Sequence, residues 1–175
     1  MPEKSQQTDY RIEALGKQHD RKSFSCGVEP LDRYLREQAR QDARKRIAAR
    51  FVLCIGQGNA VFGYYTLSAL SVDVGRWPED VARKLPRYPV VPATLLGRLA
   101  LDRSLRGKGA GEHLLIDALR RSLEATRGVA SAAVVVDAKD ENRGAFYRHY
   151  GFLPFADARG RLFLQMATLA ELFAK

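Results

Sequence analysis

The sequence predicts a single α/β domain over residues 1–175. A length of 175 residues suits one domain with a full core, and 46% hydrophobic with 28% charged residues is ordinary for a globular protein. Patterns typical of strands and helices follow one another along the chain, with no repeat or low-complexity tract between them. The length and composition indicate one globular domain, and the alternation of strand and helix patterns indicates the α/β class.

The first half of the chain predicts a strand, a helix and a hairpin. Residues 10–15 alternate in polarity as a strand does, and Pro30 suits the first turn of a helix. An apolar residue then recurs every four positions, at Leu31, Leu35, Ala39, Ala43 and Ile47. Residues 51–55 and 61–68 flank a glycine-containing turn, which indicates an antiparallel hairpin.

The second half alternates strands with helices. Four prolines within residues 75–93 indicate a short helix and an irregular loop. The expected elements after it are a strand at 94–102, a helix ending near Thr126, a buried strand at 132–137, a short helix at 141–150 and a last strand at 161–166.

A glycine-rich loop stands between the strand at 94–102 and the helix that follows. It reads Arg106-Gly107-Lys108-Gly109-Ala110-Gly111. Glycine allows backbone N–H groups to converge on one point, and a helix N-terminus adds partial positive charge there. An anionic ligand is therefore expected at this loop.

Two common nucleotide motifs do not fit the loop. A P-loop requires Ser or Thr after its lysine, but Gly109 follows Lys108. A dinucleotide fingerprint requires Gly-x-Gly-x-x-Gly, whereas the glycines here stand at alternate positions. On the loop alone, a glycine-rich turn without a ligand remains an equal alternative.

The net charge of +9 is concentrated in two segments. Residues 33–50 hold seven basic residues and two acidic ones, and residues 81–101 hold four basic residues and no acidic one. The basic residues of the first segment include a ridge on the polar side of the predicted helix, at Arg33, Arg36, Arg40 and Arg44. Like charges at this spacing cost about 0.2–0.5 kcal/mol per pair, and pairing of Asp32 with Arg36 and of Asp42 with Arg46 would relieve only part of it. Localised basic charge favours a polyanionic partner, although such a stripe is also common on a solvated face.

A second motif follows the buried strand: Asn142, then Phe146-Tyr147, then Gly151-Phe152. Together with the glycine loop about thirty residues earlier, it resembles the acetyl-CoA site of GNAT acyltransferases. The resemblance implies the acyl-CoA N-acyltransferase (GNAT) fold, with a mixed central sheet and flanking helices. It also implies a pyrophosphate site at 106–111, pairing of the Leu99-Ala100-Leu101 backbone with pantetheine, contact of Asn142 with the cofactor arm, and Tyr147 facing the thioester sulfur.

The resemblance covers nearly the whole chain and is closest to GNAT toxins of bacterial type II toxin–antitoxin modules. It rests on motifs such as Phe24-x-Cys26-Gly27, Gly63-Tyr64-Tyr65-Thr66-Leu67-Ser68 and Gly97-Arg98-Leu99-Ala100. It implies acetylation of the α-amine of aminoacyl-tRNA, inhibition of translation, an antitoxin partner that binds DNA, and a homodimer. The residues then expected to face RNA are Arg36, Arg40, Arg44, Lys45, Arg46, Arg83, Lys84, Arg87 and Arg98. Many relatives have Gln where this loop opens with Arg106, and either side chain can donate.

The chemistry of amine acetylation assigns Tyr147 as the acid. Its phenol, with a usual pKa near 10, can donate to a departing thiolate whose pKa is about 8.5–9. No carboxylate stands out as a base, with Asp102 and Asp137 as second choices. The alternatives are acetylation of a protein or small amine, and a non-catalytic GNAT-fold module that binds nucleic acid.

Several residues are expected to be structural. Cys26 and Cys54 lack the spacing of a metal or disulfide motif, the three histidines form no ligand cluster, and we expect no metal. We favour packing for Tyr64 and Tyr65, whereas Arg98 is either a buried ion-pair partner or a guide for RNA. The N-terminus has no apolar signal-like region, and no apolar run reaches 18 residues, which favours the bacterial cytoplasm.

Overall fold

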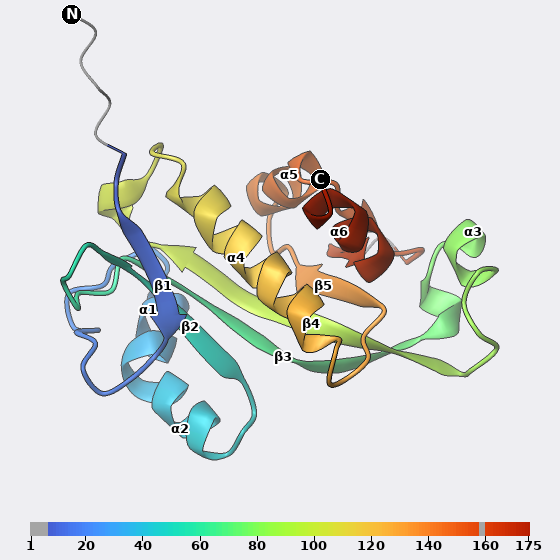
Figure 1. Cartoon of the computed structure of the whole chain (residues 1–175), viewed down its shortest axis with the longest axis horizontal. Helices are drawn as coiled ribbons and strands as arrows, with labels where there is room; N and C mark the ends of the chain where they lie inside the picture. The colour runs from blue at the N-terminus through green and yellow to red at the C-terminus, as the bar shows by residue number, and fades with distance from the viewer. Residues whose placement is uncertain (1–6, 158–159) are drawn as a thin grey trace, which may run out of the picture. The chain divides into compact units, whose positions relative to one another are not determined.

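The structure is a computed structural model that describes residues 7–157 and 160–175 (Figure 1). Its strands are β1 (Tyr10–Ala14), β2 (Ala49–Ile55), β3 (Gly63–Asp73), β4 (Val90–Leu101), β5 (Ala133–Asp137), β6 (Leu153–Pro154) and β7 (Arg161–Gln165). Its helices are α1 (Glu29–Arg33), α2 (Ala39–Arg44), α3 (Glu79–Ala82), α4 (Ala110–Ala125), α5 (Glu141–His149) and α6 (Met166–Phe173). A π-helical turn, η1 (Tyr34–Gln38), joins α1 to α2, and η2 (Val74–Arg76) and η3 (Arg103–Leu105) are short 3-10 turns.

The strands form one mixed sheet in the order β1-β2-β3-β4-β5-β7-β6. β1 pairs antiparallel with β2, and β5 pairs antiparallel with β7 but parallel with β4. The predicted mixed sheet with flanking helices is thereby confirmed. The chain divides into two compact units, Met1–Thr66 with Arg98–Asp117 and Leu67–Gly97 with Ala118–Lys175, so that β3, β4 and α4 each contribute to both.

In the first unit, the alternation along β2 separates two packed faces. Val52 and Cys54 belong to the core under the helix of residues 29–44, together with Leu35 and Tyr64. The intervening Phe51 stacks on the ring of Tyr65, at 5.1 Å between centroids.

Tyr65 in turn donates a hydrogen bond of 2.5 Å to Asp117 on α4. The helix of residues 29–44 and the first part of α4 therefore cover opposite faces of this part of the sheet. Gly63 lies on the α4 side, where a Cβ would come 2.8 Å from Leu114 Cδ1, so this close approach requires glycine.

The predicted helix from Pro30 exists, but η1 changes its register. Leu31, Leu35 and Ala39 are buried as expected, whereas Ile47 lies beyond α2 and is 61% exposed. Because a π turn adds one residue to the helical repeat, the four-residue spacing no longer follows one face after η1.

The predicted pairing of Asp32 with Arg36 and of Asp42 with Arg46 is also wrong. Asp32 accepts the Cys26 N–H at 2.9 Å, and Asp42 accepts the Tyr34 hydroxyl at 2.7 Å. Arg36 instead pairs with Glu29 at 3.4 Å. Both aspartates thus fix the helix in place, and the acid that pairs with the ridge is Glu29, which also lies 3.7 Å from Arg33.

The second unit has its own aromatic core. Trp77 lies 4.8 Å from Phe155 and 4.9 Å from Phe163 between ring centroids, and apolar residues of β3, β4 and β5 surround this group. The predicted elements of this half are present. β4 begins at Val90 rather than at residue 94, and α4 runs from Ala110 to Ala125, which agrees with the predicted end near Thr126. β6 and α6 were not predicted.

Candidate active site

The glycine loop has the backbone that an anion cradle requires. Gly107 and Gly109 have φ of 74° and 78°, a region that favours glycine. A Cβ on either residue would meet no atom within 4 Å, so the space beside them is open. Ala110 and Gly111 belong to the first turn of α4, a helix of 16 residues whose first N–H groups lack helical acceptors. The loop and the start of α4 together fit a phosphate group.

Arg106 holds the start of the loop against the segment before α1. Its Nη2 donates a hydrogen bond of 2.7 Å to the Cys26 carbonyl. Gly27, with φ of 89°, leaves room for this contact, since a Cβ there would come 2.9 Å from the same nitrogen. This hydrogen bond ties the Arg106 side chain, and with it the start of the loop, to the segment before α1.

The residues expected to pair with pantetheine form the end of β4. Ala100 is buried, and Leu99 and Leu101 are half-buried. β4 pairs with β5 from Thr94 to Leu96 and continues to Leu101, whereas β5 ends at Asp137.

Asp102, one of the two candidate bases, has a structural role. It accepts hydrogen bonds from the backbone N–H groups of Ser25 at 2.9 Å and Ser104 at 3.0 Å. Partial burial raises the pKa of Asp102, but these hydrogen bonds outweigh burial and leave the pKa below its usual value. A carboxylate with a lowered pKa and occupied oxygens is a poor general base.

Asp137, the other candidate base, is also engaged. Arg161 donates to its two oxygens from Nε at 2.8 Å and from Nη2 at 3.1 Å. This bidentate ion pair ties β5 to β7 and leaves Asp137 little capacity to accept a substrate proton.

Tyr147 lies on α5 with only 7% of its surface exposed. The rings of Phe146 and Phe152 lie 5.3 Å from it between centroids. Burial raises the pKa of Tyr147 to about 12, with Arg143 acting weakly in the opposite direction. Its hydroxyl has no hydrogen-bond partner among the described residues, so it is free to donate to a ligand.

Asn142 occupies the first turn of the same helix. Asp140 caps α5 by accepting the Arg143 N–H at 2.8 Å, and Asn142 is exposed beside this cap. The helix thus presents Asn142 at its start and Tyr147 near its end. His149 is exposed and contacts the Tyr150 ring.

The first basic segment lies in the first unit. Arg36, Arg40 and Arg44 follow one another along η1 and α2, and the exposed Lys45 and Arg46 follow the helix. Arg98 stacks over the Tyr34 ring at 3.6 Å from its centroid and has no ion-pair partner among the described residues. Sequence reasoning missed Lys17 and Arg21, which line a pocket with Arg40 and Arg44. Their position in a connector without periodicity gave no signal.

The second basic segment lies in the second unit. Arg83 pairs with Glu79 at 3.1 Å, and Lys84 is exposed. Arg83 and Arg87 line a cavity of about 630 Å³ together with Tyr88, which is 69% exposed.

The structure brings together one group of metal-ligand types that the sequence did not indicate. Ligand atoms of Glu13, His19 and Cys54 lie within 4.8 Å of one another. His19 Nδ1 accepts the Gly16 N–H at 2.9 Å, so the ring proton lies on Nε2 and is donated to Glu13 at 2.7 Å. A metal-binding histidine normally donates from its second nitrogen, so this cluster reads as a hydrogen-bond network.

The residues expected to pack do so. Cys26 and Cys54 are buried free thiols whose pKa values are raised by burial. Tyr64 and Tyr65 are also buried, and Tyr64 donates to the Leu31 carbonyl at 2.6 Å. No helix within residues 7–157 and 160–175 has the length and hydropathy to cross a membrane.

The mixed sheet with flanking helices and the open glycine loop before α4 are those of the acyltransferase class. The chain belongs to the acetyltransferase (GNAT) family, whose model matches residues 17–152. It is 38% identical to a tRNA-acetylating toxin of Mycobacterium tuberculosis, over 74% of this chain and 76% of the relative. It is 29% identical to the probable toxin TacT of Sinorhizobium fredii, over 88% and 89% of the two chains.

Solved structures agree with these relatives. The chain is similar to AtaT complexed with acetyl-methionyl-tRNAfMet, with a TM-score of 0.87, 31% identity and coverage of 94% of this chain and 99% of the other. It is also similar to a Tyr-to-Phe variant of AtaT bound to acetyl-CoA and the C-terminus of the antitoxin AtaR. There the TM-score is 0.80, with 29% identity and coverage of 95% and 99%.

Proposed function

We propose that this chain is a toxin that uses acetyl-CoA to acetylate the α-amine of aminoacyl-tRNA and thereby blocks translation. The observation that carries the proposal is the 38% identity to a tRNA-acetylating toxin over three quarters of each chain. The loop geometry supports it independently, because Gly107 and Gly109 form an open cradle of the kind that a pyrophosphate requires.

The residues around the donor have complementary roles in this proposal. The loop of residues 106–111 binds the pyrophosphate of acetyl-CoA, and the backbone of Leu99, Ala100 and Leu101 pairs with pantetheine. Asn142 contacts the same arm. A strand N–H near Leu99 to Leu101 would donate a hydrogen bond to the thioester carbonyl oxygen as negative charge develops on that oxygen.

Tyr147 stabilises the leaving thiolate in this proposal. Full proton transfer from a phenol with a pKa of about 12 to a thiolate is unfavourable. For a thiol pKa of about 8.5–9, it would cost roughly 4–5 kcal/mol. Tyr147 therefore acts by donating a hydrogen bond to sulfur as the C–S bond breaks, and its raised pKa keeps the donor protonated.

The nature of the acceptor explains why a dedicated base is dispensable. At pH 7, deprotonation costs about 1–1.4 kcal/mol for an α-amine with a pKa of about 7.7–8.0, but about 4.6 kcal/mol for lysine. Asp102 and Asp137, the carboxylates considered as bases, are both occupied by structural partners. An α-amine, with its low pKa, fits this arrangement best.

The pH dependence of turnover tests this assignment. We expect kcat/KM for charged tRNA to rise with pH and to level off above about pH 9, where the α-amine is largely neutral. Because the pKa of Tyr147 is about 12, its deprotonation should cause no decline between pH 8 and pH 10. Initial rates with stable charged tRNA, measured in short assays, check this. A rate that keeps rising through pH 10 would indicate a lysine acceptor and contradict the proposal.

The proposal extends to the partners of this chain. We propose that a cognate DNA-binding antitoxin neutralises this chain, that the toxin is a homodimer, and that it acts in the bacterial cytoplasm. Support for the antitoxin comes from AtaT, which has been solved with the C-terminus of AtaR. The basic residues of 36–46 and 83–98 are the proposed RNA-facing set.

A further inference from the structure

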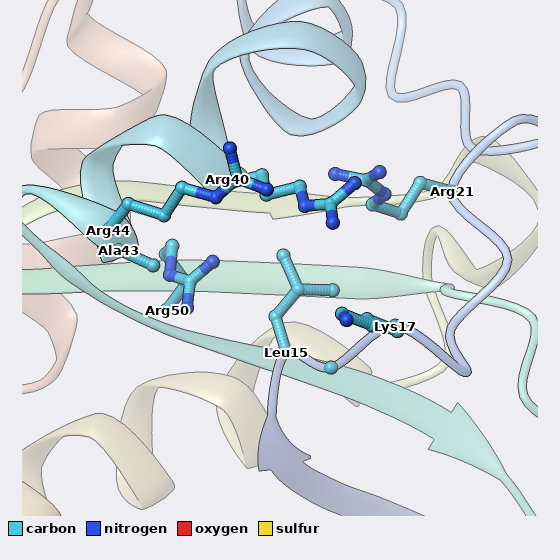
Figure 2. A pocket seen from close by; sticks show the side chains of 8 residues that line it. Leu15, Lys17, Arg21, Arg40, Ala43, Arg44 and Arg50 are labelled. Atoms are coloured by element: carbon cyan, nitrogen blue, oxygen red, sulfur yellow. The ribbon is translucent and has the colours of Figure 1, made fainter.

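A basic pocket of about 490 Å³ lies within the first unit, on the side of the sheet that carries α2. Figure 2 shows its lining, which comes from the connector after β1, from α2 and from the start of β2. The lining residues are Leu15, Gly16, Lys17, Arg21, Arg40, Ala43, Arg44 and Arg50.

The lining contains five cationic side chains and no acidic one. None of the five has an ion-pair partner among the described residues. Bringing like charges together around a cavity destabilises the fold unless an anion is present. The charge pattern of this pocket therefore points to a ligand rather than to stability.

Arg50 and Arg21 are held in position by the helix above them. Arg50 Nη1 donates to the Ala39 carbonyl at 2.9 Å, and Arg21 Nη1 donates to the Leu35 carbonyl at 3.3 Å. In each guanidinium, one nitrogen is thus used in a hydrogen bond that fixes the orientation of the side chain. Arg50 Nε is buried without a partner, and burial lowers the pKa of Arg50; Tyr34 and Asp42 act in the opposite direction, and Arg21 acts in the same direction as burial. An incoming oxygen acceptor would remove both penalties.

We propose that this pocket binds a phosphate of the RNA backbone. Guanidinium groups match phosphate oxygens in geometry and charge. The lining includes no aromatic side chain on which a base could stack, so it can recognise a phosphate but not a nucleobase. The exposed Lys45 and Arg46 continue the positive charge beyond the pocket, which suits a chain of phosphates better than a free nucleotide.

The inference rests on the proposed function for the source of the RNA, namely the body of the charged tRNA. It adds Lys17, Arg21 and Arg50 to the RNA-facing residues. Contacts of this kind position a nucleic acid without reading its sequence. The pocket should therefore increase affinity for every tRNA, with the choice among charged tRNAs made elsewhere.

The test compares two double variants that each remove two positive charges. Arg40→Gln with Arg44→Gln changes the pocket, and Arg127→Gln with Lys175→Gln changes exposed residues elsewhere. Binding of uncharged tRNA is measured by fluorescence anisotropy over a range of KCl concentrations. We expect the pocket variant to bind about tenfold more weakly and its salt slope to fall by about 0.7–0.9, the value for one lost phosphate contact. The control should match the unaltered protein.

Coenzyme A affinity and the thermal melting temperature are measured on the same proteins. Unchanged values of both exclude a general loss of structure. Equal tRNA affinity and salt slope in the pocket and control variants would overturn the inference. So would ATP binding that disappears in the pocket variant while tRNA affinity stays unchanged, because the pocket would then serve a free nucleotide. The two proposals can also fail separately. If the unaltered protein acetylates no charged tRNA but the pocket variant still loses tRNA affinity, the pocket is supported as a phosphate site and the proposed function is contradicted.

Discussion

Tyr147→Phe should lower kcat for acetyl transfer at least about tenfold while leaving the KM for acetyl-CoA nearly unchanged. The substitution removes only a hydroxyl that has no partner among the described residues, so the packing against Phe146 and Phe152 should persist. What is lost is the hydrogen bond to the departing sulfur. Steady-state kinetics with charged tRNA as acceptor measure the effect.

Tyr10→Phe is the matched control for this substitution. Tyr10 lies on β1 with its ring against His113, and its hydroxyl is likewise unpaired among the described residues. It should retain the full rate. A Tyr147→Phe protein with unchanged kcat would contradict the assignment of Tyr147 as donor to the leaving group, even if it folded normally.

Replacing both Gly107 and Gly109 by alanine should weaken coenzyme A binding at least about tenfold. Both residues have positive φ, where a Cβ costs roughly 1–2 kcal/mol per residue. The loop relieves this strain by changing its backbone, which turns its N–H groups away from the pyrophosphate. Isothermal titration with coenzyme A gives the change in Kd directly, and every 1.4 kcal/mol corresponds to a tenfold change.

Gly75→Ala provides the comparison for the glycine substitutions. A Cβ on Gly75 also meets no atom within 4 Å, but its φ is not positive. It should therefore bind coenzyme A as tightly as the unaltered protein. If the Gly107→Ala, Gly109→Ala protein bound coenzyme A with unchanged affinity, the cradle would not be the pyrophosphate site.

The fold was largely predictable because hydrophobic periodicity and glycine placement are local signals. The antiparallel hairpin, the strand before the glycine loop and the helix after it are all present. The π turn at Tyr34–Gln38 was not predictable, and neither were the contacts of Asp32 with Cys26 and of Asp42 with Tyr34 on either side of it. Those contacts join residues through the folded chain, and periodicity within the helix does not report them.

The site was predictable to the extent that its residues stand in motifs. The positive φ of Gly107 and Gly109 and the buried position of Tyr147 agree with the roles expected of them, which remain predictions for this chain. Only part of the basic pocket could be predicted from the sequence. Arg40 and Arg44 stand on a periodic ridge, but Arg21 and Lys17 come from a connector that folding brings to the ridge.

The most direct test of the central claim locates the acetyl group after reaction. The purified protein is incubated with labelled acetyl-CoA and total charged tRNA, and the products are separated into RNA and protein and digested to identify the acetylated atom. We expect label on the α-amino group of amino acids esterified to tRNA, and its loss when the tRNA is deacylated before the reaction. Label confined to lysine side chains, or no transfer to charged tRNA, would contradict the account.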